Sequence, residues 1–354
     1  MPRSQKDLMI NALFLGKPGT QSGVYYFANQ LISEFQKSYP DVMILVSKSS
    51  GITGKSIVKV PAFPLKLRFI YESFYRLKYR SKYWLNLDYF LPFRFGFNCP
   101  GDAVVIHDFL VYDKPHVVSL FRRLWIKWQF KRTSLFAEKV ITVSEFSANR
   151  FRQIFPSQEA KCSIIPVPID LSRFHHFESS AKLDFLNHPY LLTISSPWQH
   201  KNLGVLDQIM PSVYANHGVC LIKVGARQKP FKLMDFDFHD CAIYNFGYVS
   251  DEILGQLIKS SKAVLAPSTY EGFGMTVYES LGLGIPVIAS DLDSYPKVST
   301  LIRVKDYLSS TAWESAINNL LEAATLTNTK HSFDISLYSV SKIAHEYVQV
   351  LITE

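Results

Sequence analysis

Short apolar segments alternate with helix-length segments along almost the whole chain, and this alternation constrains the fold more than any other feature. Apolar runs of about four to eight residues are typical of buried strands, and strands separated by helical patterns indicate βαβ units with parallel sheets. In the first half, the expected strands are Leu8–Leu15, Val42–Ser47, Ala103–His107, Lys139–Val143 and Cys162–Val167. In the second half, they are Tyr190–Ile194, Cys220–Val224, Ala242–Phe246, Ala263–Ala266 and Pro286–Ala289.

The alternation stops over residues 170–188, a polar segment without clear periodicity. This interruption marks the predicted boundary between a first domain over residues 1–175 and a second over residues 186–334. Residues 335–354 carry apolar side chains at helical spacing and predict a final helix. We therefore expect two doubly wound α/β domains, whose ligands bind beyond the carboxyl ends of the strands.

Composition and charge fit this organisation. Of 354 residues, 47% are hydrophobic, and no apolar run approaches the roughly 18 residues needed to cross a bilayer. Basic residues precede the run LMINALFL, but no small-residue cleavage site follows, which favours a first strand over a signal peptide. The four cysteines are widely spaced, so a reduced, cytoplasmic protein is expected. The net charge of +8 favours an anionic partner.

The segment EGFGMTVYE, from Glu271 to Glu279, carries the strongest chemical signal. It begins in a turn-rich loop after the expected strand Ala263–Ala266 and continues into a helix. Amides at the start of that helix form an anion site suited to a diphosphate, and they belong to Phe273, Gly274, Met275 and Thr276. Glu279 can accept two ribose hydroxyl hydrogen bonds, and Glu271 is expected nearer the reacting sugar. The alternative is a pair of ordinary capping or solvated carboxylates, which the adjacent glycines and strands disfavour.

The stretch Lys262–Ser290 resembles the donor-site signature of retaining family 4 glycosyltransferases of the GT-B fold, in which the same spacing separates two glutamates. VSEFS at 143–147 and CLIKVG at 220–225 are also similar to segments of this family, and His107-Asp108 resembles the HD pair of bacterial mannosyl- and rhamnosyl-type members. The resemblance implies two Rossmann-like domains facing a central cleft, with the nucleotide in the C-terminal domain and the acceptor mainly on the N-terminal one. It also implies that the final helix crosses back to pack on the N-terminal domain.

Three more site positions are carried over from this resemblance. Lys201 matches a basic residue that binds the donor phosphate. The segment Gly16–Gly23 matches a glycine-containing loop that approaches the same phosphates, with Gly23 at the start of the following helix. His107 is expected to face the donor sugar.

The chain also departs from the family pattern. The arginine that commonly precedes the lysine is missing, so Ser196 with backbone amides, or Arg227, is expected to serve the phosphate instead. Lys297 stands where the family commonly has a glutamate, which changes the contacts of that loop.

Metal ligands are not expected. The pairs Asp235-x-Asp237 and Asp291-x-Asp293 could bridge a cation to a diphosphate in another glycosyltransferase fold, but neither lies in an N-terminal nucleotide half. The histidines at 175, 176 and 239 show no metal-ligand spacing. We therefore expect no cofactor besides the donor itself.

Two basic-aromatic stretches, residues 66–82 and 121–132, stand out from the rest of the chain. For residues 66–82 the favoured interpretation is a helix with core aromatics and solvated charges. An amphipathic helix on an anionic membrane, with Trp84 at the interface, follows closely. Stacking on nucleic acid is the least favoured interpretation, because the donor-site signature needs no polymer to explain it.

The predicted function is metal-independent, retaining transfer of a hexosyl unit from a nucleoside diphosphate sugar to a saccharide or lipid-linked saccharide. Glu271 and His107 are the expected catalytic-site residues, and GDP-mannose is the first expected donor, with rhamnose or another hexose as the alternative. Polysaccharide or lipopolysaccharide synthesis at the inner face of the cell membrane is the expected setting. An epimerase or phosphorylase of the same fold, or a non-catalytic nucleotide-sugar-binding subunit, remains open.

Overall fold

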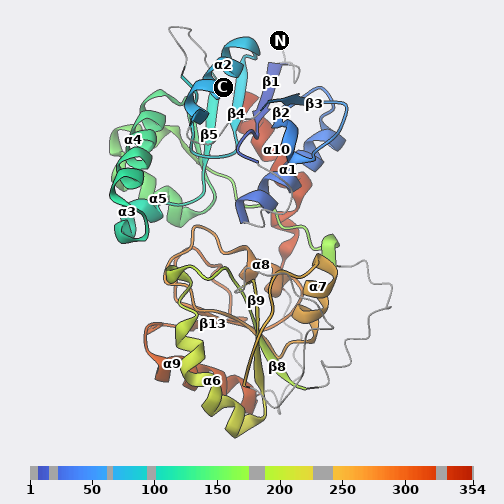
Figure 1. The fold of residues 1–354 in the computed structure, drawn as a ribbon, viewed down its shortest axis with the longest axis vertical. Helices are drawn as coiled ribbons and strands as arrows, with labels where there is room; N and C mark the ends of the chain where they lie inside the picture. Colours follow the sequence, from blue (N-terminus) through green and yellow to red (C-terminus); the bar gives the residue numbers. More distant parts are fainter. Residues whose placement is uncertain are drawn as a thin grey trace. The chain divides into compact units, whose positions relative to one another are not determined.

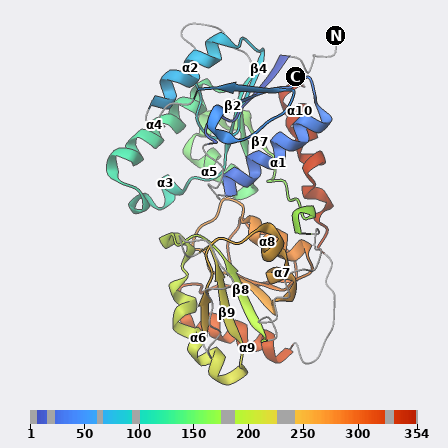
Figure 2. The same cartoon turned by 45° about the vertical axis from the view of Figure 1, so that its right-hand side comes forward.

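The computed structural model describes residues 7–15, 23–61, 67–93, 101–174, 188–225, 242–323 and 333–352. It divides into two compact units (Figures 1 and 2). The first unit comprises Met1–Pro168 together with Leu337–Glu354, and the second comprises Ile169–Ser336.

The first unit contains a seven-stranded parallel sheet with the strand order β3-β2-β1-β4-β5-β6-β7. Its strands are β1 Leu8–Asn11, β2 Met43–Ser47, β3 Ile57–Val60, β4 Tyr83–Asn86, β5 Asp102–Ile106, β6 Lys139–Thr142 and β7 Cys162–Ile164. Its helices are α1 Gly23–Ser38, α2 Arg68–Lys78, α3 Leu110–Asp113, α4 Leu120–Phe136, α5 Glu145–Ile154 and α10 Val340–Ile352. The last helix packs against α1, where Tyr347 meets the Phe27 ring at 6.4 Å between centroids. The expected return of the final helix to the N-terminal domain is confirmed.

The second unit repeats this architecture with a six-stranded parallel sheet of order β10-β9-β8-β11-β12-β13. Its strands are β8 Tyr190–Ile194, β9 Cys220–Val224, β10 Ile243–Asn245, β11 Ala263–Ala266, β12 Val287–Ser290 and β13 Leu301–Val304. Its helices are α6 Gly204–His217, α7 Asp251–Ser260, α8 Met275–Gly282 and α9 Ser310–Ala323. Both sheets are parallel and doubly wound, so the predicted α/β class is confirmed.

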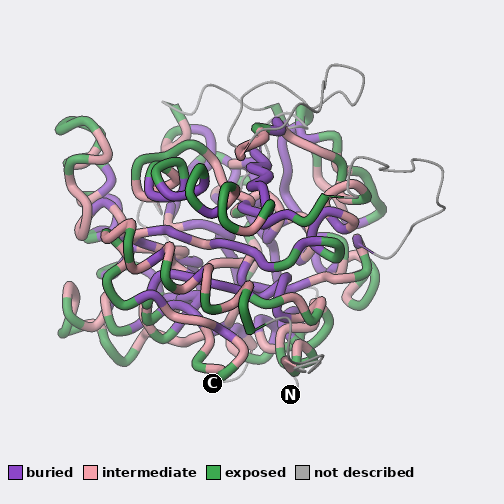
Figure 3. The backbone as a smooth tube through the Cα atoms, turned by 90° about the horizontal axis from the view of Figure 1, so that it is seen from below, coloured by how far each residue is buried: buried purple, intermediate pink, exposed green. Residues whose placement is uncertain are grey.

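Buried apolar side chains cover both faces of the second sheet, and Figure 3 shows that buried residues lie inside while exposed ones follow the outer turns. Trp313 is fully buried on one face, and Phe174 is fully buried on the other. Because Phe174 belongs to this core, the division between the units falls at Pro168, before the predicted boundary at residue 175.

The central strand β4 is absent from the strands predicted from sequence. Its residues, YWLN, directly follow the basic-aromatic stretch 66–82 and end on a polar side chain, so they do not form an apolar run. Trp84 is nevertheless fully buried, and its Nε1 donates to Oδ1 of Asn86 at 3.0 Å. The alternative interpretation that places Trp84 at a membrane interface is therefore wrong for this residue. Within the described residues, no helix combines the length and apolar character required to span a membrane.

Candidate functional site

The strand order of the second unit places a topological switch point between β8 and β11. The chain leaves β8 toward β9 and β10 on one side, and then returns to place β11 on the other side. Loops that follow the two central strands diverge at such a point, which is where open α/β sheets bind ligands. Lys201 follows β8 and Glu271 follows β11, so two predicted site residues come from these loops.

The structure brings Lys201 and Glu271 into direct contact. The Lys201 Nζ lies 2.6 Å from Oε1 of Glu271, and the hydroxyl of Ser268 donates to the same oxygen at 2.7 Å. The two loops are also joined through the backbone, because the amide of Thr269 donates to the carbonyl of His200 at 2.7 Å. Both charged side chains remain about one-fifth exposed, at 20% for Lys201 and 18% for Glu271. A cation and a carboxylate are therefore held together at the sheet edge within reach of solvent.

The N-terminus of α8 lies where the sequence predicts an anion site. Gly274 caps this helix with φ of 89°, a left-handed conformation that glycine adopts without strain. The first amides of a helix have no intrahelical partner and carry its positive dipole end, so those of Met275 and Thr276 are suited to a phosphate. The Phe273 side chain is instead stacked on Tyr278, with ring centroids 4.1 Å apart, so we expect this residue to offer its backbone.

The Tyr295 ring packs directly against Gly274. A Cβ on residue 274 would lie only 2.3 Å from Cε1 of its ring. Burial raises the pKa of Tyr295 well above its ordinary value, and the Glu271 carboxylate raises it further. The tyrosine therefore stays neutral and acts as a packed wall, with its hydroxyl near Ser268.

Gly274→Ala is expected to destabilise the second unit by about 2–5 kcal/mol, because the left-handed backbone and the collision with Tyr295 add together. Gly284→Ala is the matched control, since Gly284 has φ of 76° but no atom within 4 Å of the added Cβ. It should cost only about 1–2 kcal/mol. Urea unfolding of both variants checks this, and equal losses would contradict a steric role for Tyr295.

Glu279 lies in the second turn of α8 and is 4% exposed. Its Oε1 accepts from Nη2 of Arg173 at 2.7 Å, and Nη1 of the same guanidinium donates to Asp251 at 2.8 Å. Burial raises the pKa of Glu279, and the charge and hydrogen bond of Arg173 oppose that increase. Arg173 thus helps to keep a buried carboxylate ionised, and the sequence analysis did not identify it.

Ser196 and two residues of the first unit complete the predicted set. Ser196 follows β8, and its carbonyl accepts from the Ser195 hydroxyl at 3.1 Å. Gly23 is the exposed first residue of α1, whereas residues 16–22 of the expected glycine loop lie outside the described residues. His107 directly follows β5.

His107 is held in one orientation by its neighbours. Its Nε2 lies 3.1 Å from the Leu87 carbonyl, and its ring meets Phe27 edge-on at 4.7 Å. A carbonyl only accepts hydrogen bonds, so Nε2 carries the proton and Nδ1 is the acceptor of the neutral ring. Burial lowers the pKa of His107 despite the opposing effect of the Leu87 hydrogen bond, which favours this neutral form.

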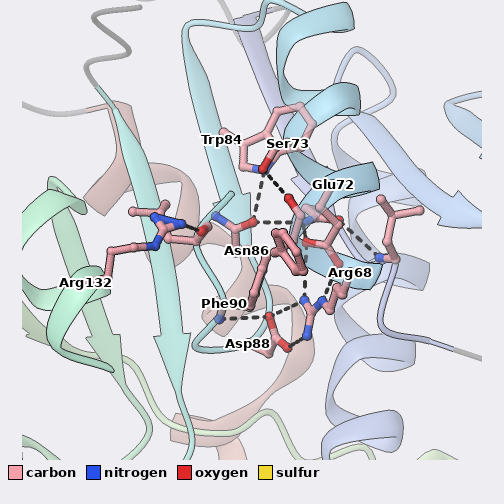
Figure 4. A network of polar contacts seen from close by, with 12 residues as sticks. Arg68, Glu72, Ser73, Trp84, Asn86, Asp88, Phe90 and Arg132 are labelled. Atoms are coloured by element: carbon pink, nitrogen blue, oxygen red, sulfur yellow. Dashed lines mark hydrogen bonds and ion pairs between the residues drawn. The ribbon is translucent and has the colours of Figure 1, made fainter. Parts of the chain in front are cut away.

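A polar network occupies the switch point of the first unit, between β1 and β4 (Figure 4). Asn11 and Asn86 are register partners on these strands, and Nδ2 of Asn11 donates to Oδ1 of Asn86 at 2.9 Å. The same Nδ2 donates to Glu72 at 2.8 Å, and Arg68 joins Glu72 to Asp88. The network therefore links the start of α2 to the carboxyl edge of the sheet.

This network corrects the interpretation of residues 66–82 as a helix with solvated charges. Arg68 pairs with Glu72 and Asp88, and Arg76 is buried with its Nη2 2.9 Å from Oδ1 of Asp102. Two of the basic residues in this stretch therefore stabilise the interior.

The candidate metal pairs show no cation site in the described part of the chain. Asp291 forms an ion pair with Arg303 at 2.7 Å, and no group of three or more potential ligands is found among the described residues. The other candidates lie outside the described residues, namely Asp235, Asp237, His175, His176, His239 and the alternative phosphate ligand Arg227.

Two doubly wound parallel units, the second with a lysine–glutamate pair and a helix N-terminus at its switch point, are typical of the GT-B class of folds. Comparison with known proteins agrees with this class. Residues 188–323 match the family model described as glycosyl transferases group 1. Residues 188–323 are thus similar to the group 1 glycosyl transferases, and the fold of the chain is the GT-B fold.

Two relatives and one solved structure are similar to this chain over most of its length. The chain is 24% identical to O-antigen chain mannosyltransferase B of Escherichia coli over 74% of this chain and 73% of that protein. It is 22% identical to O-antigen chain mannosyltransferase RfbU of Salmonella typhimurium over 88% of this chain and 90% of that protein. Among solved structures, Anabaena HepE in complex with UDP and glucose matches with a TM-score of 0.70 at 14% identity, covering 98% of this chain and all of HepE.

Proposed function

We propose that this glycosyltransferase moves a hexosyl unit, with retention of anomeric configuration, from a nucleoside diphosphate sugar to a saccharide acceptor. The observation that carries the proposal is the contact between Lys201 and Glu271 beside the N-terminus of α8. A diphosphate bound there would receive the Lys201 cation and the α8 amides, and Glu271 would lie next to the sugar that the diphosphate carries. These groups would stabilise the charge that develops on the leaving phosphate.

The reaction we propose needs no nucleophile from the protein. The bond between the anomeric carbon and the diphosphate oxygen breaks while the acceptor hydroxyl oxygen bonds to the same carbon on the same face. The hydroxyl proton passes to the leaving diphosphate, so a nucleoside diphosphate is released. Glu271 and neutral His107 would position the sugar by hydrogen bonds, and the sequence resemblance supports these roles.

Glu279 is proposed to recognise the ribose. Two ribose hydroxyls can donate to an ionised carboxylate, and Arg173 favours the ionised form of this buried group. The carboxylate is oriented in advance, because one of its oxygens already accepts from Arg173. Gly23 and Ser196 are proposed to add phosphate contacts, which the resemblance supports.

The donor and acceptor are proposed from the relatives. Both O-antigen relatives are named as mannosyltransferases, which favours GDP-mannose as the donor and a lipid-linked O-antigen or lipopolysaccharide saccharide as the acceptor. HepE binds UDP, so a uridine donor is the alternative that a screen should include. We propose that transfer needs no metal and takes place at the cytoplasmic face of the membrane.

A thermal-shift screen with guanosine, uridine, thymidine and adenosine diphosphates, with and without sugars, tests the nucleotide site. One nucleotide at a hundredfold excess over its Kd should stabilise the protein by about 2.7 kcal/mol, which raises Tm by about 5 °C or more. Glu279→Gln should abolish the shift. A protein that no nucleotide stabilises would favour a different role, and donor consumption without a saccharide acceptor would favour an epimerase or phosphorylase.

A further inference from the structure

Helix α4 exposes most of its large apolar side chains and buries few of them. The exposed fraction is 86% for Phe121, 56% for Leu124, 44% for Trp125, 43% for Trp128 and 48% for Leu135. Side chains of this size are normally withdrawn from water, and contiguous apolar patches on a protein surface mark interaction sites.

These side chains share one side of the helix. Phe121, Leu124, Trp128 and Leu135 are spaced by three, four and seven residues, which places them along one stripe of an α-helix. The opposite side, with Ile126 and Phe130, packs into the core of the first unit. The helix is therefore apolar toward the core and apolar again toward solvent.

Helix α2 contacts α4 and exposes apolar side chains of its own. The Phe69 ring lies 6.0 Å from the Trp125 ring between centroids, which joins the two helices. Beyond this contact, α2 exposes 54% of Ile70 and 59% of Phe74. We call the combined surface the aromatic-basic face, and it consists of Ile70, Phe74, Phe121, Arg122, Leu124, Trp125, Trp128, Lys131 and Leu135.

The charge of this face has one sign. Helix α4 carries five basic residues and no acidic residue in its 17 positions. Arg122 and Lys131 are both exposed. Lys131 lies along the apolar stripe, three residues after Trp128, and Arg122 follows Phe121 in the first turn of the helix. The sole carboxylate of α2, on Glu72, is buried and paired with Arg68, so it does not offset this charge.

We infer that the aromatic-basic face docks on the surface of an anionic lipid bilayer. Apolar and aromatic side chains enter the boundary between headgroups and acyl chains, while lysine and arginine reach the anionic headgroups. Trp125 and Trp128 have the amphipathic rings that concentrate at this depth. A second copy of the chain is a poorer occupant, because a symmetric contact would bring Arg122 and Lys131 of both copies together.

The sequence placed the possible membrane contact in residues 66–82, whereas the exposed side chains place most of it on α4. The inference extends the proposed function, because a lipid-linked acceptor would be presented at the same bilayer. It does not depend on catalysis, since vesicle binding can be measured without nucleotide sugar.

Vesicle co-sedimentation tests the inference on the whole 354-residue chain. The wild-type protein should bind vesicles of phosphatidylcholine with phosphatidylglycerol and bind poorly to pure phosphatidylcholine. Tryptophan emission should shift to shorter wavelength on binding, because Trp125 and Trp128 would leave water.

Two pairs of variants distinguish the effect of where the basic residues lie from the effect of the total net charge. R122E/K131E should weaken binding about tenfold or more, since each basic residue near an anionic surface contributes roughly a fivefold factor. K262E/K342E changes the net charge equally at exposed lysines outside the face, and it should weaken binding by no more than about twofold. Likewise, F121S/L124S should reduce binding strongly, and L308S, at a leucine 70% exposed in the second unit, should not.

The outcomes are distinct from those of the transferase test. Absent binding to anionic vesicles, or equal weakening by the control pair, would overturn the membrane inference and leave the nucleotide site untouched. Lipid-independent dimerisation that F121S/L124S abolishes would also overturn it, by showing that a second copy covers the face. Nucleotide stabilisation should persist in every variant of the face.

Discussion

Glu271→Gln should lower kcat for sugar transfer by a factor of about 10²–10³ or more while leaving the fold intact. The amide keeps the size of the side chain and one oxygen that can accept from Ser268, but it removes the negative charge that faces Lys201 at 2.6 Å. The loss of a single preorganised electrostatic contact in an active site typically costs this much. Initial rates at saturating donor and acceptor measure the effect.

The stability of this variant distinguishes a catalytic role from a structural one. Glu271 and Lys201 are both partly exposed, so their pair should contribute no more than about 1 kcal/mol to folding. Glu252→Gln is a matched control, because Glu252 is an exposed glutamate in the first turn of α7 in the same unit. Full activity of Glu271→Gln, or an equal loss of activity in both variants, would exclude the proposed role.

The second unit was largely predictable because its strands are apolar runs that are buried on both faces. β8, β9 and β11 have the predicted bounds, and the contact of Lys201 with Glu271 follows from their adjacency in a parallel sheet. The local sequence was sufficient here, since Lys201 and Glu271 each lie in the loop that follows a strand. Gly274 was likewise predictable, because the start of a helix beside a ligand commonly needs a glycine.

The first unit was less predictable because polar side chains carry part of its interior. β4 ends on Asn86, and α2 contributes Arg68, Glu72 and Arg76 to buried contacts. A sequence in which arginine and glutamate alternate with aromatics resembles a solvated surface helix. These charges can be buried because they form ion pairs with residues far along the chain. No local sequence pattern identifies Asp88 or Asp102 as those partners.

Arg173, which belongs to the candidate site, could not be predicted from the local sequence either. It lies in the polar segment between the two strand series, and its contact with Glu279 spans 106 positions of the sequence. A single arginine in such a segment carries no periodicity and no motif. The structure identifies it because Phe174 anchors this segment to the core of the second unit.

Arg173→Met should destabilise the second unit by about 3–5 kcal/mol at neutral pH, since it leaves the buried Glu279 carboxylate without its cation. Arg152→Met breaks an exposed pair with Glu145 and should cost no more than about 1 kcal/mol, which makes it the matched control. Urea unfolding at pH 7.5 measures both. A loss in Arg173→Met no larger than in the control would contradict the importance of the pair.

The pH dependence of the Arg173→Met deficit identifies its cause. Burial already raises the pKa of Glu279 in the wild-type protein, and removing the guanidinium should raise it further. A carboxyl whose pKa is higher in the folded than in the unfolded state destabilises the fold above that pKa, and the penalty disappears as pH falls through it. The deficit should therefore shrink toward pH 5. In addition, R173M/E279L should recover most of the stability, because an apolar pair often replaces a buried ion pair at little cost, yet it should not bind nucleotide.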